Sequence, residues 1–289
     1  MEPENIATRR RSCLAVPGGE IRKLARAADA GADEVVIDLE DAVPAADKDR
    51  ARDLVARTLA TWTGGAVTVR INPPRSPWCH RDLEMCVAAG AVLSTVVVPK
   101  VEDAGDLAFL DRLLDGMEAA ADRREPLGVQ ALIESAAGLE RVSHIAGSSR
   151  RLRALILGYA DLAASLGRRA QAWGYARDVL LVAARTHGLA AIDGPFLGVA
   201  DDDDFRAVVA ESRELGFDGK WVIHPRQIAT VNAAFAPTAD EIEEAGRILH
   251  ALEQAELAGK GAVSLDGRMV DEAVAVAARR VLAQAGAAS

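Results

Sequence analysis

Charged residues stand at the ends of apolar, β-branched runs, a pattern that predicts one site built from several strands. The run Val35–Ile37 leads into the carboxylates of Asp38, Glu40 and Asp41. Carboxylates this close together cost free energy unless a cation or hydrogen-bond donors compensate them. The same arrangement of an apolar run followed by charge recurs at Arg70, Lys100, Glu134 and His224.

Glu134 and Asp161 are the strongest candidates for metal ligands. They follow the predicted strands Gly128–Ile133 and Ala154–Leu157, so neighbouring strands would present both carboxylates to one space. Two carboxylates with open positions suit Mg²⁺, which keeps waters and takes substrate oxygens as its other ligands. Each carboxylate could instead cap the helix that follows it, and spacing alone does not separate these interpretations.

Arg70 and the pair Glu40 and Asp41 are candidates for catalytic groups. Arg70 lies at the C-terminal end of the run Val67–Ile71, where a fixed guanidinium can bind a carboxylate or stabilise an enolate oxygen. An ion pair on the outside of the fold is the alternative. Glu40 and Asp41 are expected to bind metal-ligated waters or to orient a neighbouring Arg or Lys. They could also be loop carboxylates before Pro44.

A Pro-Gly-Gly turn at 17–19 precedes a helix that carries Lys23, and Arg11 lies close by in sequence. Glycines let the backbone approach a phosphate, and a helix N-terminus adds partial positive charge, so these residues are candidates for anion binding. The motif is weak by itself because Pro-Gly turns before helices are common. His224 is a candidate either to hydrogen-bond a ligand or to cap the helix that follows it.

Strands and helices are expected to alternate along the chain and to position these residues. Short β-branched runs are followed by longer stretches in which apolar residues have the spacing of an α-helix. Strands are expected at Ser12–Val16, Glu34–Ile37, Val67–Ile71, Thr95–Val98, Gly128–Ile133, Ala154–Leu157, Ala190–Ile192 and Lys220–Ile223. Helices are expected at Ile21–Ala30, Lys48–Leu59, Asp82–Ala89, Leu107–Ala121, Leu139–Ile145, Ala176–His187, Asp204–Leu215 and Gln227–Ala234.

Eight such strand–helix units predict an α/β fold, a (β/α)₈ TIM barrel over residues 1–236, whose C-terminal strand ends carry the chemistry. An open doubly wound sheet is the alternative, but it would concentrate its ligand groups at one switch point. The charged strand ends here are spread over most units, and the chain lacks a Gly-x-Gly-x-x-Gly turn. The barrel is therefore the preferred fold.

Residues 237–289 break the alternation and are expected to form a C-terminal helical lid able to cover the barrel mouth. Thr238 and Glu241 form a capping box for a long helix that ends at Leu257. A glycine-rich, mobile loop is expected at Gly259–Arg268, followed by a last helix from about Asp271. Taken alone, Asp271 is predicted to be the N-cap of that helix.

Composition narrows the class of protein. Half of the 289 residues are hydrophobic, and the net charge of −9 argues against nucleic acid or an anionic membrane as the main partner. Three cysteines without Cys-x-x-Cys spacing fit reduced thiols in a cytoplasmic protein. The N-terminus lacks the apolar stretch of a secretory signal, and no apolar run approaches the roughly 20 residues that span a bilayer.

Taken together, several motifs in order along nearly the whole chain resemble the citrate lyase β-subunit-like family of CoA-ester lyases. Those in the N-terminal half are residues 11–18, 38–43 with Lys48 and Arg52, 69–72, 76–78 with Asp82, and 98–102. Those in the C-terminal half are residues 133–135, 157–158 with Asp161, 192–193, 216–220, 223–225 with Gln227, and 261–271.

The resemblance implies a (β/α)₈ barrel with a C-terminal lid, assembled as a homotrimer or hexamer. It also implies that Glu134 and Asp161 ligate Mg²⁺, that Arg70 contacts the substrate, and that Arg11 and Lys23 help to bind the phosphates of CoA. In relatives the lid aspartate, here Asp271, reaches the neighbouring subunit's site as an acid/base group.

One departure from the family pattern concerns the residues before Asp161. Many relatives carry Glu directly before this aspartate, whereas Tyr159 and Ala160 precede it here. The expected metal ligand is retained, but its changed neighbours could alter the pocket. The resemblance therefore does not by itself identify which relative's substrate this chain uses.

The expected activity is Mg²⁺-dependent, reversible Claisen-type cleavage of a 3-hydroxyacyl-CoA, such as malyl-CoA or citramalyl-CoA, to acetyl-CoA and a 2-oxo acid. One alternative is a CoA-independent aldolase of 2-oxo acids. Another is the β component of a multi-subunit citrate lyase, which acts on an acyl-carrier protein. A non-catalytic CoA-binding regulator is disfavoured because every candidate catalytic group is present.

Overall fold

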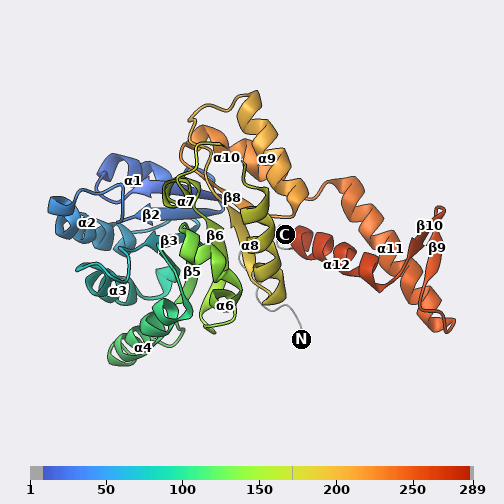
Figure 1. Ribbon diagram of the computed structural model, residues 1–289, viewed down its shortest axis with the longest axis horizontal. Coiled ribbons are helices and arrows are strands. Elements are labelled where there is room, and N and C mark those ends of the chain that lie inside the picture. The colour runs from blue at the N-terminus through green and yellow to red at the C-terminus, as the bar shows by residue number, and fades with distance from the viewer. Residues whose placement is uncertain (1–8, 171, 287–289) are drawn as a thin grey trace.

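Eight parallel strands close into a barrel in the computed structural model, which describes residues 9–170 and 172–286 (Figure 1). Each strand pairs with the next along the chain, and β8 pairs back with β1. The strands are β1 (Ser12–Pro17), β2 (Glu34–Asp38), β3 (Ala66–Arg70), β4 (Leu93–Val98), β5 (Gly128–Ile133), β6 (Leu152–Leu157), β7 (Ala190–Asp193) and β8 (Gly219–Val222). The predicted (β/α)₈ TIM barrel is confirmed.

Helices cover the outside of the barrel. They are α1 (Ile21–Ala27), α2 (Lys48–Ala60), α3 (Cys79–Ala88), α4 (Ala104–Ala120), α5 (Ala136–Glu140), α6 (Val142–Ala146), α7 (Tyr159–Leu166), α8 (Gly174–Thr186), α9 (Asp203–Leu215) and α10 (Ile228–Ala234). Short 3₁₀ turns occur at η1 (Ala45–Asp47), η2 (Gly90–Val92) and η3 (Pro225–Gln227). The predicted helix Leu139–Ile145 is divided into α5 and α6, and α7 has no predicted counterpart. With 8 residues, α7 is too short for a helical period to stand out.

The barrel interior is layered from one end to the other. At the N-terminal end, Glu34 accepts hydrogen bonds from Arg10 Nε and Gln130 Nε2, both at 3.0 Å. At the C-terminal end, Asp38 and Arg70 face inward. Between these polar ends lies an apolar layer formed by Cys13, Val36, Val97, Leu132, Ala154, Ile156, Ile192 and Trp221.

The outward faces of the strands form a second core against the helices. Val35 and Ile37 of β2, for example, belong to one cluster with Leu24 of α1 and Val55 of α2. Strands that are buried on both faces have nearly continuous apolar sequences. This burial explains why the β-branched runs predicted the strand positions so closely.

After α10 the chain leaves the barrel as an arm, residues 239–286. The arm contains α11 (Ala239–Leu257), a hairpin of β9 (Val263–Leu265) and β10 (Arg268–Val270), and α12 (Glu272–Gly286). α11 begins with the predicted capping box, in which Thr238 Oγ1 accepts from Glu241 N (3.2 Å) and Glu241 Oε2 accepts from Thr238 N (2.8 Å). Leu252, Val270 and Ala275 form the small core of the arm.

The predicted mobile loop at Gly259–Arg268 is wrong in its second half, which forms the β9–β10 hairpin. Asp266 and Gly267 make its two-residue turn, and both have positive φ angles, 49° and 78°. Asp-Gly is a preferred sequence for such a turn because both positions need this backbone conformation. In the sequence, this Asp-Gly pair is difficult to recognise as a hairpin turn because Gly259 and Gly261 lie nearby and suggest a loop.

The arm extends away from the barrel and does not fold over the mouth of its own barrel (Figure 1). Arg213 of α9 pairs with Glu241 of α11 at 2.6 Å, and Arg280 of α12 pairs with Asp218. Asp218 immediately precedes β8, so this second contact lies towards the N-terminal end of the barrel. Within one chain the arm therefore does not act as the expected lid.

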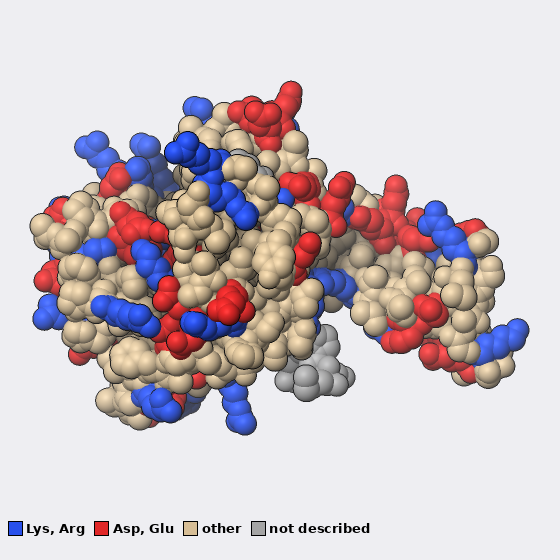
Figure 2. Space-filling view, in the orientation of Figure 1, with Lys and Arg blue, Asp and Glu red and all other residues tan. Residues whose placement is uncertain are grey.

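Surface charge on the visible face is mixed. Figure 2 shows Lys and Arg side chains scattered among Asp and Glu. None of the described helices has both the length and the apolar character needed to cross a bilayer.

Candidate active site

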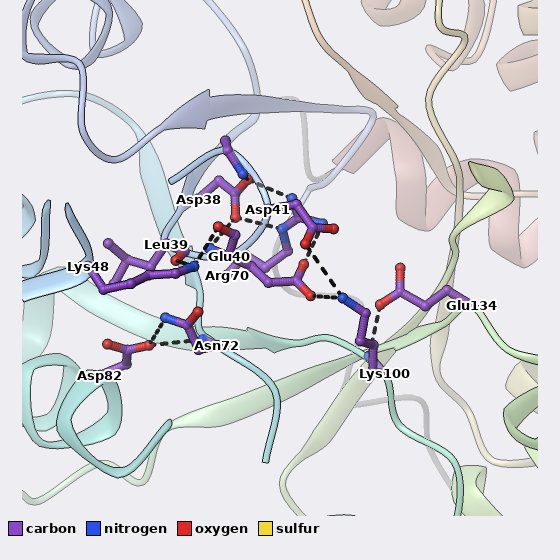
Figure 3. A network of polar contacts seen from close by, with 11 residues as sticks. Asp38, Leu39, Glu40, Asp41, Lys48, Arg70, Asn72, Asp82, Lys100 and Glu134 are labelled. Carbon is purple, nitrogen blue, oxygen red and sulfur yellow. Dashed lines mark hydrogen bonds and ion pairs between the residues drawn. The ribbon is translucent and has the colours of Figure 1, made fainter. Parts of the chain in front are cut away.

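The C-terminal ends of β2 to β5 bring four charged residues together at the barrel mouth (Figure 3). Asp38 ends β2, Arg70 ends β3, Lys100 follows β4 and Glu134 follows β5. Parallel barrel strands all end on the same face, so residues distant in sequence become neighbours there. The structure thus places the predicted charged strand ends in one network.

Arg70 is held rigidly in this network. In the register of β2 and β3 it lies opposite Asp38, to which it donates two hydrogen bonds, Nε–Oδ1 at 2.7 Å and Nη2–Oδ2 at 2.6 Å. Its Nη1 lies 3.0 Å from Glu40 Oε2, and its guanidinium lies 5.7 Å from the centroid of the Trp221 ring. A bidentate carboxylate and an aromatic face fix the plane of a guanidinium. Arg70 is therefore preorganised at the floor of the mouth.

Lys100 links three strand ends through an uncommon backbone conformation. Its φ of 54° is in the left-handed region, which costs free energy for a residue with a Cβ. In this conformation its N–H donates to Glu134 Oε1 (2.8 Å), while its Nζ donates to Glu40 Oε1 (2.5 Å). Asp41 lies 3.5 Å from the same ammonium but is mostly exposed. Glu40, in contrast, is buried between Arg70 and Lys100.

Glu134 and Asp161 interact electrostatically across the ends of β5 and β6. Burial, together with the nearby charges of Glu40 and Asp161, raises the pKa of Glu134 to about 8. Gly158 makes the approach of these strands feasible, because a Cβ there would lie 2.6 Å from Glu134 Cβ. Glu134 Oε2 accepts no hydrogen bond from the described part of the chain. Glu40 and Asp161 place negative charge near this carboxylate.

The charges around the mouth fit a divalent cation. The carboxylates of Asp38, Glu40, Asp41, Glu134 and Asp161 are accompanied by the cations of Lys48, Arg70 and Lys100. A divalent ion between Glu134 and Asp161 would supply the missing positive charge. No group of three or more His, Cys, Asp or Glu side chains in residues 9–170 and 172–286 is arranged to hold a metal. An ion here would need water and substrate for its remaining positions, which suits Mg²⁺.

Two polar anchors hold the loops behind the network. Lys48 Nζ donates to the carbonyl oxygens of Leu39 and Glu40, both at 2.7 Å, and so fixes the turn after β2. Asp82 Oδ2 accepts from Asn72 N (2.9 Å), which fixes the chain after β3. Both anchors lie within the motifs that suggested the family resemblance.

The structure does not bring Arg11 to this site. Arg11 precedes β1, at the opposite end of the barrel, where it donates to both carboxylate oxygens of Asp33 at 2.8 Å and to the Asn232 carbonyl at 2.9 Å. The expectation of a CoA phosphate contact is inconsistent with this position. Lys23, on α1 after β1, is exposed and pairs with Glu20 at 2.7 Å.

His224 and Asp271 both cap helices in this structure. His224 Nδ1 accepts from Arg226 N (3.2 Å) at the start of η3, although His224 also lies at the C-terminal end of β8 near the mouth. Asp271 Oδ1 accepts from Ala273 N (3.0 Å) at the start of α12. Asp271 lies in the arm, between β10 and α12, and the arm extends away from the barrel (Figure 1).

The sequence pattern includes Asp38 and Lys100 among the charged strand ends but predicts no specific role for either, and it does not single out Trp221. Asp38 and Lys100 carried a usable signal, because each stands at the end of a predicted strand like the residues that were assigned. Trp221 gave no such signal, since an aromatic residue inside a strand normally indicates core packing. Its indole Nε1 is buried and has no partner among the described residues.

Comparison with known proteins places this geometry in context. A family model described as HpcH/HpaI aldolase/citrate lyase matches residues 11–225. The chain is similar to an L-malyl-CoA/beta-methylmalyl-CoA lyase of Cereibacter sphaeroides, with 36% identity over 309 residues covering 99% of this chain and 97% of that protein. It is also similar to citrate lyase subunit beta of Leuconostoc mesenteroides subsp. cremoris, with 38% identity over 287 residues covering 96% and 94%.

A solved structure of similar fold contains a cation and ligands. It is the protein CitE of Mycobacterium tuberculosis in complex with magnesium, acetoacetate and coenzyme A. The TM-score is 0.76 at 29% sequence identity, and the match covers 97% of this chain and 100% of that one.

Proposed function

The chain belongs to the HpcH/HpaI aldolase/citrate lyase family, and on this premise we propose that it is a Mg²⁺-dependent acyl-CoA lyase. The proposed reaction cleaves a 3-hydroxyacyl-CoA such as malyl-CoA or citramalyl-CoA, reversibly, into acetyl-CoA and a 2-oxo acid. The observation that carries the proposal is the buried Glu134 carboxylate at the end of β5, which is close enough to Asp161 and to the fixed guanidinium of Arg70 for both charges to shift its pKa.

Glu134 and Asp161 would hold Mg²⁺. When bound, Mg²⁺ would offset their charge and polarise the carboxylate and hydroxyl oxygens of the hydroxyacyl end of the substrate. Glu134 is kept in place by the Lys100 N–H and by the close backbone of Gly158. The space beside it is thus fixed before any ligand arrives.

Arg70 would stabilise the enolate. A base takes the hydroxyl proton of the substrate, the carbon–carbon bond breaks, and its electron pair moves onto the thioester carbonyl. Arg70 uses some of its N–H groups on Asp38 and Glu40 and has others for this oxygen. We propose that Glu40 orients Arg70 and Lys100, and that Asp41 on the exposed side assists Lys100.

Asp271 from a neighbouring subunit would protonate the enolate carbon and so release acetyl-CoA. The direction of the arm supports this assignment, because the arm that contains Asp271 extends away from its own barrel (Figure 1). A homotrimer or hexamer, in which each arm reaches the next mouth, would complete every site. Lys23 and His224 remain candidates for contacts to CoA, since both follow strands on the mouth side of the barrel.

The similarity to citrate lyase subunit beta supports a second candidate, a citryl-thioester lyase component that needs an acyl-carrier protein. An assay with isolated protein separates the two functions. We expect the isolated protein with Mg²⁺ to release acetyl-CoA from malyl-CoA or citramalyl-CoA. The same assay is run with 3-hydroxy-3-methylglutaryl-CoA as a third thioester. Free CoA is measured in parallel to detect hydrolysis. Absence of cleavage with every thioester, and activity only with added carrier protein, would overturn the first candidate.

The affinity for Mg²⁺ is expected to increase as the pH rises towards about 8. Below the raised pKa of Glu134, about 8, a proton occupies the carboxylate and must leave before a cation binds. The dissociation constant should therefore fall by up to about tenfold per pH unit. Calorimetric titrations between about pH 6 and pH 9 measure this slope. A dissociation constant for Mg²⁺ that stays the same across this pH range would contradict the expectation.

The metal-free protein is expected to show the opposite trend in stability. Between the ordinary pKa of 4.5 and the raised value of about 8, the folded state binds a proton that the unfolded state has lost. The free energy of unfolding from this group then decreases as the pH rises through this range. Thermal unfolding with a chelator, compared with saturating Mg²⁺, shows whether the cation removes the trend.

A further inference from the structure

Tyr159 begins α7, two residues before Asp161, and connects this helix to neighbouring elements. Its hydroxyl donates to Asp193 Oδ1 and accepts a hydrogen bond from Arg177 Nε at 2.7 Å. Its ring packs on Trp173 with 5.0 Å between ring centroids. α7 has no side-chain N-cap, and the Tyr159 hydroxyl ties its first turn to Asp193 and Arg177 instead.

Asp193 joins this contact to the buried wall of the barrel. It ends β7, and its Oδ2 accepts hydrogen bonds from Lys220 of β8 and from Ser212 of α9. All three residues have no exposed surface. Gly194 lets the tyrosine ring lie directly on the backbone, because a Cβ at this position would be 2.8 Å from Tyr159 Cδ2. The proposed mechanism uses none of these groups.

Asp161, in contrast, has no side-chain anchor of its own. Its carboxylate makes no hydrogen bond or ion pair within residues 9–170 and 172–286, whereas Glu134 is fixed by Lys100. The position of the Asp161 carboxylate therefore depends on where the first turn of α7 lies. Tyr159 belongs to that same turn, so a shift of one residue moves the other.

We propose that Tyr159 is a positioning residue, which holds the carboxylate of Asp161 opposite Glu134 through its hydrogen bonds to Asp193 and Arg177. This inference rests on the proposed function, because it assumes that the two carboxylates share a cation. It gives a role to the Tyr-Ala sequence before Asp161, where the family resemblance leads one to expect Glu. The described contacts of the Tyr159 side chain are with Asp193, Arg177 and Trp173, so it would act on metal affinity through the position of Asp161.

The test is the affinity of the ligand-free enzyme for Mg²⁺, measured by calorimetry, with Mn²⁺ and its paramagnetic resonance signal as a second probe. Tyr159→Phe removes both hydrogen bonds and keeps the ring, and we expect it to weaken metal binding about tenfold, as loss of an outer partner of a metal ligand commonly does. Arg177→Lys keeps the charge beside Glu211 but removes the guanidinium fork, and a smaller weakening in the same direction is expected. If Tyr159→Phe does not fold, Arg177→Lys takes its place as the test of the positioning role.

Thr68→Val is the matched control. It also removes one buried hydroxyl, which donates to the Thr95 carbonyl at 2.9 Å, but in the middle of β3 and not in contact with Asp161 or Tyr159 in the described hydrogen bonds. We expect it to lower the melting temperature and to leave metal affinity unchanged. Unchanged affinity in both Tyr159→Phe and Arg177→Lys, whatever their melting temperatures, would overturn the positioning role. If wild-type protein binds no more Mg²⁺ than Glu134→Gln does, the proposed function itself fails instead.

Discussion

Replacing Glu134 by glutamine is expected to abolish Mg²⁺ binding and to lower the rate of thioester cleavage by roughly 1,000-fold, since metal stabilisation of developing charge is worth several kcal/mol. The substitution is nearly isosteric. Glutamine keeps the oxygen that accepts from Lys100 N and fits against Gly158, so the backbone should not move. Only the negative charge offered to the cation is lost.

Calorimetry with Mg²⁺ and an assay of acetyl-CoA release measure the two effects of Glu134→Gln. Glu34→Gln is the matched control, because Glu34 is also a buried glutamate in the barrel but lies at its other end with Arg10 and Gln130. It should reduce stability and leave the Mg²⁺ dissociation constant unchanged. Turnover by Glu134→Gln at the wild-type rate would remove the metal assignment.

Asp271→Asn is expected to lower turnover by about 100- to 10,000-fold without disturbing the fold, because a general acid contributes on this scale. Asparagine caps helices as well as aspartate does, so the hydrogen bond from Ala273 N can be retained. Mg²⁺ affinity should also be retained, since Asp271 lies in the arm. Acetyl-CoA release at saturating substrate, together with calorimetry, checks both expectations.

Mixing the two inactive variants tests whether the site is shared between subunits. If Asp271 serves a neighbouring barrel, random assembly of Glu134→Gln and Asp271→Asn protomers creates some sites with an intact barrel and an intact arm. An equal mixture should recover about one quarter of wild-type activity after subunit exchange. If each arm served its own barrel, no mixture would be active.

The barrel could be predicted because burial on both faces leaves a direct trace in the sequence. β2 shows this well: Val35, Val36 and Ile37 are all apolar, although Val36 faces the interior and the others face helices. The site could be anticipated for a related reason. Charge directly after such a run, as at Glu134, has to lie at a strand end, and parallel strands gather these ends on one face.

Other features depend on tertiary contacts that leave no local trace. Arg11 and Lys23 seemed close because few residues separate them, but β1 lies between them, and a strand of 6 residues spans about 20 Å. The left-handed backbone of Lys100 follows from contacts to two other strands and not from its residue type. Tyr159 likewise could not be assigned before Asp193 and Arg177, from distant parts of the chain, were seen to converge on it.

The apolar layer across the middle of the barrel, which includes Cys13 and Trp221, separates the C-terminal mouth from the other end of the barrel. Water, ions and thioesters cannot pass along the barrel axis, so everything that reacts must enter and depart through the same opening. A cation seated between Glu134 and Asp161 would lie beneath any thioester placed over it. If Glu134 and Asp161 hold the cation in this way, we expect it to bind before the thioester and to leave after it, so that a chelator removes the metal slowly while substrate occupies the mouth.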